Sequence, residues 1–170
     1  MNQLKVVLIG PMGAGKTTLG TLLSQELGWP YFDNDGELET LNDLSHEELS
    51  ALPVPELHKL EGEYLATVMQ RRAPFISGAA ASVIDYQESV ALLQDAIAIY
   101  LRLPLEKLLE RAGSTGIGRQ ALQENAESVI TQRFNKRDQL YREVARLTIE
   151  LSNNPNDDAM RILSYLKSES

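Results

Sequence analysis

The chain contains no cysteine and is short of basic residues, and each shortage excludes a class of protein. Without cysteine no disulfide can form, which fits a reducing compartment. The 16 lysines and arginines stand against 24 aspartates and glutamates, so that the formal net charge is -8. This balance argues against nucleic acid or an anionic membrane as the main partner.

Long apolar runs are also missing. No run approaches the length that spans a bilayer, and the first five residues lead into a short strand rather than into a cleavable leader. At 170 residues, the chain is long enough to bury a substantial core within one domain. We therefore expect a single cytoplasmic domain that covers residues 1–170.

Short apolar runs alternate with segments of helical spacing. Five runs predict strands: Lys5–Ile9, Tyr31–Phe32, Phe75–Ser77, Ala96–Leu101 and Leu147–Leu151. Helical spacing is strong in Asn125–Ala145 and Asp157–Leu166, whereas Pro53-Val54-Pro55 interrupts a helical pattern. Strands that alternate with helices favour an α/β fold, in which helices cover both faces of a five-stranded parallel sheet.

Residues Gly10–Thr18 read GPMGAGKTT and match the phosphate-loop pattern G-x-x-x-x-G-K-[ST]. The loop follows an apolar strand and opens a helical segment, an arrangement in which backbone N–H groups surround phosphate oxygens. Lys16 would reach the β- and γ-phosphates, and the Thr17 hydroxyl would ligate Mg²⁺. We predict that this loop binds a nucleoside triphosphate through Gly13, Ala14, Gly15, Lys16, Thr17 and Thr18. The fold is then a phosphate-loop α/β/α sandwich.

Many phosphate-loop proteins carry a metal-side carboxylate at the end of a later strand, but the strands that end near Ser77 and Leu101 have none. The nearest strand-end acids are Asp33 and Asp35 in the sequence YFDND. Because the carboxyl ends of parallel strands face the ligand crevice, we predict that one acid serves the metal and the other an acceptor hydroxyl. The alternative is an ordinary polar turn.

The sequence GSTGIG at Gly113–Gly118 is the most glycine-rich stretch outside the phosphate loop, and Arg119 follows it. It is either a flexible connection or a mobile lid over residues 112–124 that brings an arginine over phosphates. We predict the lid.

With these residues the chain resembles the shikimate kinase family of small phosphotransferases. The resemblance extends over nearly the whole chain and includes the phosphate loop, the Asp-x-Asp of FDND and the stretch Glu56–Glu61. It continues through Ser77–Ala80, Glu110-Arg111, the glycine-rich segment before Arg119 and the sequence RDQLY at Arg137–Tyr141. The Asp-x-Asp and the Arg-x-x-Leu-Tyr are the parts that distinguish this family from other phosphate-loop enzymes.

The resemblance implies a role for each residue. Asp33 would assist the metal, and Asp35 would orient or deprotonate the acceptor hydroxyl. Arg111 would stack on adenine, Arg119 would close over the transferring phosphate, and Arg137 would bind an acceptor carboxylate. These roles suit phosphoryl transfer, which depends on positioning and charge neutralisation.

Three departures fall in the acceptor region, which we place at about residues 34–66. His58 stands where the family has a second carboxylate-binding arginine, and Glu61, one turn on, is expected to raise its pKa. The family's glycine triplet becomes Gly78-Ala79-Ala80, where added methyl groups would crowd a ligand and positive φ angles would be penalised. After Arg119 the chain reads Gln-Ala-Leu, whereas the family usually has Pro-Leu-Leu.

We therefore predict an ATP- and Mg²⁺-dependent kinase that phosphorylates a hydroxyl of shikimate or a similar small acceptor. Catalysis would involve Lys16, Asp35 and Arg119, and the acceptor would meet Asp35, His58, Gly78, Ala79, Ala80 and Arg137. The resemblance implies a place in aromatic amino acid biosynthesis, and we expect a monomer. Three alternatives stay open: a kinase for a different sugar acid, cyclitol or nucleotide, a catalytically weak nucleotide-binding module, and a general ATPase.

Overall fold

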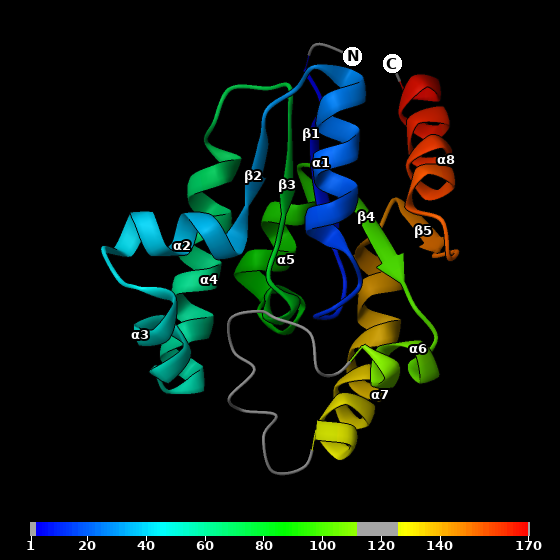
Figure 1. The fold of residues 1–170 in the computed structure, drawn as a ribbon. Coiled ribbons are helices and arrows are strands. Elements are labelled where there is room, and N and C mark those ends of the chain that lie inside the picture. Colours follow the sequence, from blue (N-terminus) through cyan, green and yellow to red (C-terminus); the bar gives the residue numbers. More distant parts are fainter. Residues whose placement is uncertain (1–2, 112–125, 170) are drawn as a thin grey trace.

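A five-stranded parallel sheet forms the centre of the computed structural model, which describes residues 3–111 and 126–169 (Figure 1). The strands lie in the order β2-β3-β1-β4-β5. Their bounds are β1 Lys5–Ile9, β2 Tyr31–Asp33, β3 Phe75–Gly78, β4 Ile97–Arg102 and β5 Leu147–Glu150. β1 pairs with β3 on one side and with β4 on the other, so that the strand before the phosphate loop is central.

Helices cover both faces of the sheet. Their bounds are α1 Lys16–Leu27, α2 Asn34–Asn42, α3 His46–Ala51, α4 Val54–Met69, the 3-10 turn η1 Ala81–Asp85, α5 Gln87–Gln94, α6 Leu105–Glu110, α7 Ala126–Val144 and α8 Pro155–Ser168. Alternate residues of β1 face opposite sides, as a strand buried on both faces requires. Val6 and Leu8 belong to the core under α1 and α8, whereas Val7 and Ile9 belong to the core under α4 and α5.

The predicted fold class is confirmed, and the predicted elements lie close to those observed. The β1 bounds agree in full, and α7 differs from the predicted helix by one residue at each end. Pro53 precedes the first residue of α4, so the proline pair marks a helix start, where a missing N–H costs nothing. The predicted lid at 112–124, with Gly113–Gly118 and Arg119, lies outside the described residues and stays a prediction.

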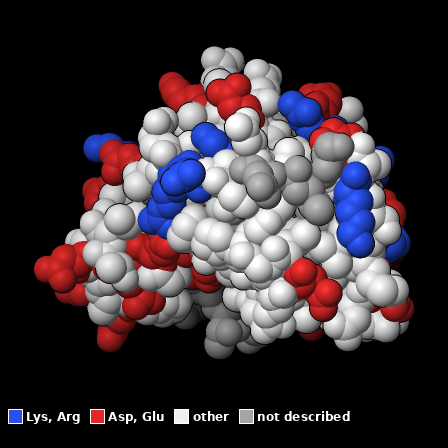
Figure 2. Space-filling view, turned by 90° about the horizontal axis from the view of Figure 1, so that it is seen from above, with Lys and Arg blue, Asp and Glu red and all other residues white. Residues whose placement is uncertain are grey.

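The described helices are all too short or too polar to cross a bilayer. On the face shown in Figure 2, basic and acidic side chains are interspersed, and acidic side chains gather on the side where α2 and α3 lie. No continuous basic surface extends across the part of this face that the structure describes.

Candidate active site

The carboxyl ends of β1, β2 and β3 meet at one edge of the sheet and place three segments around a common cleft. β1 runs into the phosphate loop, β2 ends at Asp33, and β3 ends at Gly78. Residues from all three segments and from α4 line this loop cleft: Met12, Gly13, Gly15, Lys16, Thr17, Thr18, Asp33, Asn34, Asp35, His46, Glu61, Gly78, Ala79, Ala80, Ala81 and Arg111. The structure thus brings together the loop and both acids that the sequence singled out.

The phosphate loop has the backbone of an anion cradle. Gly15 is the N-cap residue of α1 and has a left-handed backbone conformation with φ 93°. It has no side chain that could accept a hydrogen bond from the first N–H groups of the helix, so these groups are available to an anion in the cleft. A Cβ on Gly10, whose φ is 145°, would lie 2.9 Å from the carbonyl oxygen of Leu101. Glycine is therefore required at both ends of the loop.

Lys16 occupies the middle of the cradle. Its Nζ donates to the carbonyl oxygens of Gly10 at 2.8 Å and Pro11 at 2.9 Å. Burial lowers the lysine pKa to about 8, although the nearby carboxylates of Asp35 and Asp33 act in the opposite direction. An anion that approaches such a desolvated lysine stabilises its charged form, so the loop and Lys16 suit a polyphosphate.

Thr17 and Asp33 supply oxygen ligands beside the loop. The Thr17 hydroxyl donates to Asp33 Oδ1 at 3.0 Å, and the Tyr31 hydroxyl donates to the same oxygen at 2.8 Å. Within the described residues no group of three or more acidic, histidine or cysteine side chains could hold a metal ion. One hydroxyl and one carboxylate suit Mg²⁺, which takes few protein ligands and completes its shell with water and phosphate.

Asp35 is exposed at the start of α2 and lines the loop cleft together with Lys16. Its neighbour Asn34 is almost fully buried and donates from Nδ2 to Asp35 Oδ1 at 3.2 Å. The side-chain oxygen of Asn34 is buried without a hydrogen-bond partner among the described residues. The amide therefore orients the Asp35 carboxylate, a role that the sequence did not indicate because Asn is common in any polar turn.

A second cavity, the side pocket, adjoins the loop cleft and shares Met12, Glu61 and Ala81 with it. Its remaining lining residues are Ser50, Ala51, Leu52, Pro53, Val54, Leu57, His58, Ser82, Arg133 and Arg137. Predicted acceptor residues His58 and Arg137 thus lie in the same pocket.

Glu61 lies at the junction of the two cavities and is 7% exposed. The Ser82 hydroxyl donates to its Oε2. Burial raises the pKa of Glu61 to about 7, and the bond from Ser82 opposes part of this rise. The carboxyl group is therefore near its midpoint of titration at neutral pH.

His58 does not behave as the sequence suggested. Its Nδ1 lies 2.8 Å from the Tyr86 hydroxyl, and the two rings meet edge to face. The pKa of His58 is lowered, first by burial and then by the positive charge of Arg137. The expectation that Glu61 raises this pKa is wrong, because Glu61 is bonded to Ser82 instead. His58 is therefore neutral at pH 7.

Arg137 is 8% exposed and paired with a carboxylate. Its Nη2 and Nε donate to Asp85 Oδ2 at 2.6 and 3.1 Å. Lys136 Nζ lies 3.2 Å from Asp85 Oδ1. These contacts hold the Arg137 guanidinium at the wall of the side pocket. Burial lowers the pKa of Arg137, but the hydrogen bonds to Asp85 and the charges of Tyr141, Asp85 and Glu61 together raise it above the ordinary value.

The segment Gly78-Ala79-Ala80 lines the cleft as predicted, but its backbone is unstrained. Only Asp43 has a positive φ among the non-glycine residues that the structure describes, so the expected penalty at Ala79 and Ala80 is wrong. The close contact is at Gly78, where a Cβ would lie 2.7 Å from the Tyr31 hydroxyl. Ala79 and Ala80 line the cleft and also belong to the core under α4 and α5.

Arg111 ends α6 beside the phosphate loop, and its Nη1 donates to the carbonyl oxygen of Gly13 at 3.1 Å. This position is compatible with its predicted contact to the nucleotide. Arg119 lies outside the described residues, and its role stays a prediction.

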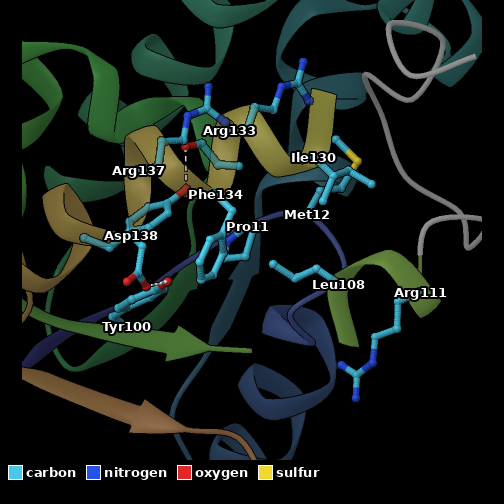
Figure 3. A pocket seen from close by; sticks show the side chains of 12 residues that line it. Pro11, Met12, Tyr100, Leu108, Arg111, Ile130, Arg133, Phe134, Arg137 and Asp138 are labelled. Carbon is cyan, nitrogen blue, oxygen red and sulfur yellow. Dashed lines mark hydrogen bonds between the residues drawn. The ribbon is translucent and has the colours of Figure 1, made fainter. Parts of the chain in front are cut away.

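Arg133 is the basic residue of the site that the sequence did not reveal. It lines the side pocket and also a pocket between the phosphate loop, α6 and α7, which Figure 3 shows. The sequence pattern of α7 draws attention to its apolar residues, and only the fold shows that an arginine on this helix faces a cavity.

Comparison with known proteins agrees with this geometry. A family model described as shikimate kinase matches residues 12–167. The shikimate kinase of Methylococcus capsulatus is 30% identical over 179 aligned positions, covering 98% of this chain and 95% of that protein. The shikimate kinase of Acinetobacter baumannii (strain AYE) is 32% identical over 174 positions, covering 96% of this chain and 92% of that protein.

A solved structure gives the same result. The shikimate kinase from Acinetobacter baumannii in complex with shikimate superposes with a TM-score of 0.89 at 31% identity, covering 99% of this chain and 95% of that chain. Sequence, fold and cleft therefore agree, and the chain belongs to the shikimate kinase family.

Proposed function

We propose that this chain transfers the γ-phosphoryl group of ATP to a hydroxyl of shikimate, as an enzyme of aromatic amino acid biosynthesis. One observation carries the proposal: Lys16 and Asp35 line a cleft that adjoins, at Glu61, a pocket with a fixed arginine. Two adjoining cavities of this kind suit an acceptor that has a hydroxyl at one end and a carboxylate at the other. Family membership supports the same activity.

The phosphate loop would bind the phosphates of ATP. The N–H groups at the start of α1 and the Lys16 ammonium would bind the β- and γ-phosphate oxygens, and Thr17 with Asp33 would hold Mg²⁺. The metal ion would supply charge neutralisation on those oxygens. Asp33 is kept in place for this task by the hydroxyl groups of Tyr31 and Thr17. Arg111 is placed to contact the nucleotide and Arg119 is proposed to close over the phosphates.

Asp35 and the side pocket would bind the acceptor. The hydroxyl oxygen of the acceptor would bond to the γ-phosphorus of ATP while the bond between that phosphorus and the leaving ADP breaks. Asp35 would accept the proton that the hydroxyl loses in this step. Asn34 keeps the carboxylate oriented. Arg137 would bind the acceptor carboxylate through the donors that Asp85 leaves available, and Gly78, Ala79, Ala80 would border the ring.

The proposal is tested by a coupled ADP-release assay across shikimate, quinate, gluconate, cyclitols and nucleoside monophosphates. We expect release with shikimate, and loss of at least 100-fold in kcat in Lys16→Ala and in Asp35→Asn, since each removes a group that acts in the transition state. Lys167→Ala and Asp95→Asn, which lie outside both cavities, are the matched controls. Substantial residual turnover in Asp35→Asn would remove that residue from the reaction.

A kinase for another hydroxylated acceptor is the second candidate, and the neutral His58 favours it. Release with a different acceptor in the same panel and none with shikimate would select it. ATP binding without release for any acceptor would select the nucleotide-binding module instead.

We also propose that residues 1–170 act as one domain with a lid at about 112–124 and an acceptor region at about 34–66. A cytoplasmic location and the absence of a nucleic-acid partner agree with the net charge of -8. The large apolar side chains most exposed in the described chain are Leu41, Val54, Tyr86 and Met160, and their scatter over different elements supports a monomer.

A further inference from the structure

We propose that Arg133 is a specificity-determining residue, which together with Arg137 forms a two-guanidinium clamp for the acceptor carboxylate on one face of α7. We call these two residues the α7 arginine pair. The inference rests on the proposed function and names the recognition element of its acceptor pocket.

Helical geometry places the pair on one face. Residues four apart in an α-helix lie one above the other, and Arg133 and Arg137 are separated by four positions in α7. Figure 3 shows both side chains leaving the helix on the same side. Both also line the side pocket with His58 and Glu61. Two guanidinium groups thus border one cavity.

In the part of the chain that the structure describes, Arg133 makes no close contact with a carboxylate, whereas Arg71 and Arg102 do. Arg71 is paired with Glu37 and Arg102 with Asp138, each at less than 3 Å. Arg133 is partly buried, yet within residues 3–111 and 126–169 it makes no hydrogen bond or ion pair. Its pKa is lowered, first by burial and then by the charge of Arg137. The charges of Asp85 and Glu61 offset only part of this effect, so an anion that enters the pocket stabilises the partly buried guanidinium.

The other charged or titratable groups near the side pocket are already engaged or carry little charge, so the α7 arginine pair is what can bind an anion there. Lys136 is engaged with Asp85 and largely exposed. Arg137 donates from Nε and Nη2 to Asp85, whereas its Nη1 has no partner in the described chain. His58 is neutral and bonded to Tyr86. Glu61 is the one acid among the described residues that lines the side pocket, and its raised pKa reduces the negative charge that an incoming carboxylate would meet.

A carboxylate is the anion that this arrangement favours. Two guanidinium planes offer paired N–H donors to planar oxygens. The pocket also lies on the acceptor side of Glu61, away from the Lys16 cradle that suits phosphate. An acceptor carboxylate at the pair leaves the rest of a small ring to extend toward Asp35.

Arg133→Gln tests the clamp, with Arg142→Gln as the control that removes the same charge from an exposed site on α7. Kinetics are measured with shikimate and with its uncharged amide. We expect the KM for shikimate to rise about 10-fold or more in Arg133→Gln, the size of one lost charge-assisted contact. The KM for ATP, the kinetics with the amide and the control should change less than 2-fold.

Each other outcome overturns a different statement. Turnover of shikimate with an unchanged KM in Arg133→Gln refutes the clamp and leaves the function standing. A rise in the KM for ATP alone makes Arg133 a nucleotide contact, and weaker binding of inorganic phosphate alone makes the pair a phosphate site. If the wild-type chain does not phosphorylate shikimate, the proposed function fails. The clamp is then tested by calorimetry, which measures the binding of quinate and gluconate to the wild type and to Arg133→Gln. Equal binding of these carboxylates by the two proteins would refute the clamp.

Discussion

Glu61 should make the folded protein less stable as the pH rises from 5.5 to 8. The carboxyl group is 7% exposed, and its pKa rises from the ordinary 4.5 to about 7 on folding. Between these two values the unfolded chain releases a proton that the folded chain keeps. The folded state therefore binds more protons, and linkage requires that its stability falls with increasing pH.

The magnitude follows from the two pKa values. Complete titration would cost about 3 kcal/mol, and the part that falls between pH 5.5 and 8 is about 2 kcal/mol. Measurements below pH 5.5 are less useful because the sequence pI is about 4.8, where net charge no longer keeps the protein in solution. With an m value of about 2 kcal/mol/M, the effect corresponds to a shift of about 1 M in the urea midpoint.

The assay is urea unfolding of the wild type and of Glu61→Gln at pH 5.5, 6.5, 7.25 and 8. Other groups titrate in this range as well: His58 and Lys16, whose pKa values are lowered by burial, add stability to the folded state as the pH rises. The quantity to follow is therefore the difference in unfolding free energy between variant and wild type, which should move by about 2 kcal/mol in favour of the variant. Glu63→Gln, at an exposed site on α4, is the control. A difference that stays constant with pH would refute the reasoning.

Two further predictions concern the acceptor side of the cleft. Gly78→Ala places a methyl group 2.7 Å from the Tyr31 hydroxyl, so we expect a loss of about 1–3 kcal/mol in unfolding free energy. Tyr31→Phe in the same chain should recover part of it in urea unfolding, and no recovery would place the strain elsewhere. His58→Arg adds a charged donor beside the pocket and should lower the KM for shikimate about 10-fold. An unchanged KM, or loss of turnover with another acceptor, would count against shikimate as the substrate.

The donor half of the site could be read from the sequence because it is contiguous. The loop, its lysine and its threonine occupy Gly10–Thr18, and the flanking strand and helix have clear periodicity. Asp33 was found for the same reason, since it ends a short strand whose neighbour in the sheet is β3. Local patterns specify local structure, and parallel strands then align their carboxyl ends without further information.

The acceptor half could not be read in the same way because it is assembled from α2, α4, η1 and α7. The Ser82–Glu61 bond joins residues that are 21 positions apart, and it redirects the acid that was expected to serve His58. The buried Asn34 and the pocket-facing Arg133 were missed, since burial and facing depend on which helices pack together. A single residue type at a single position carries no signal of either.

The charge distribution of the chain explains how an acidic protein can bind two anions. With a net charge of -8, the overall field repels both ATP and a carboxylated acceptor. Arg71 and Arg102 are neutralised by carboxylates away from the cleft. Lys16, by contrast, is bonded to carbonyl oxygens and keeps its charge for a ligand. Attraction is therefore short-range, so raising the salt concentration should weaken encounter less than in an enzyme that steers its substrates over long distances.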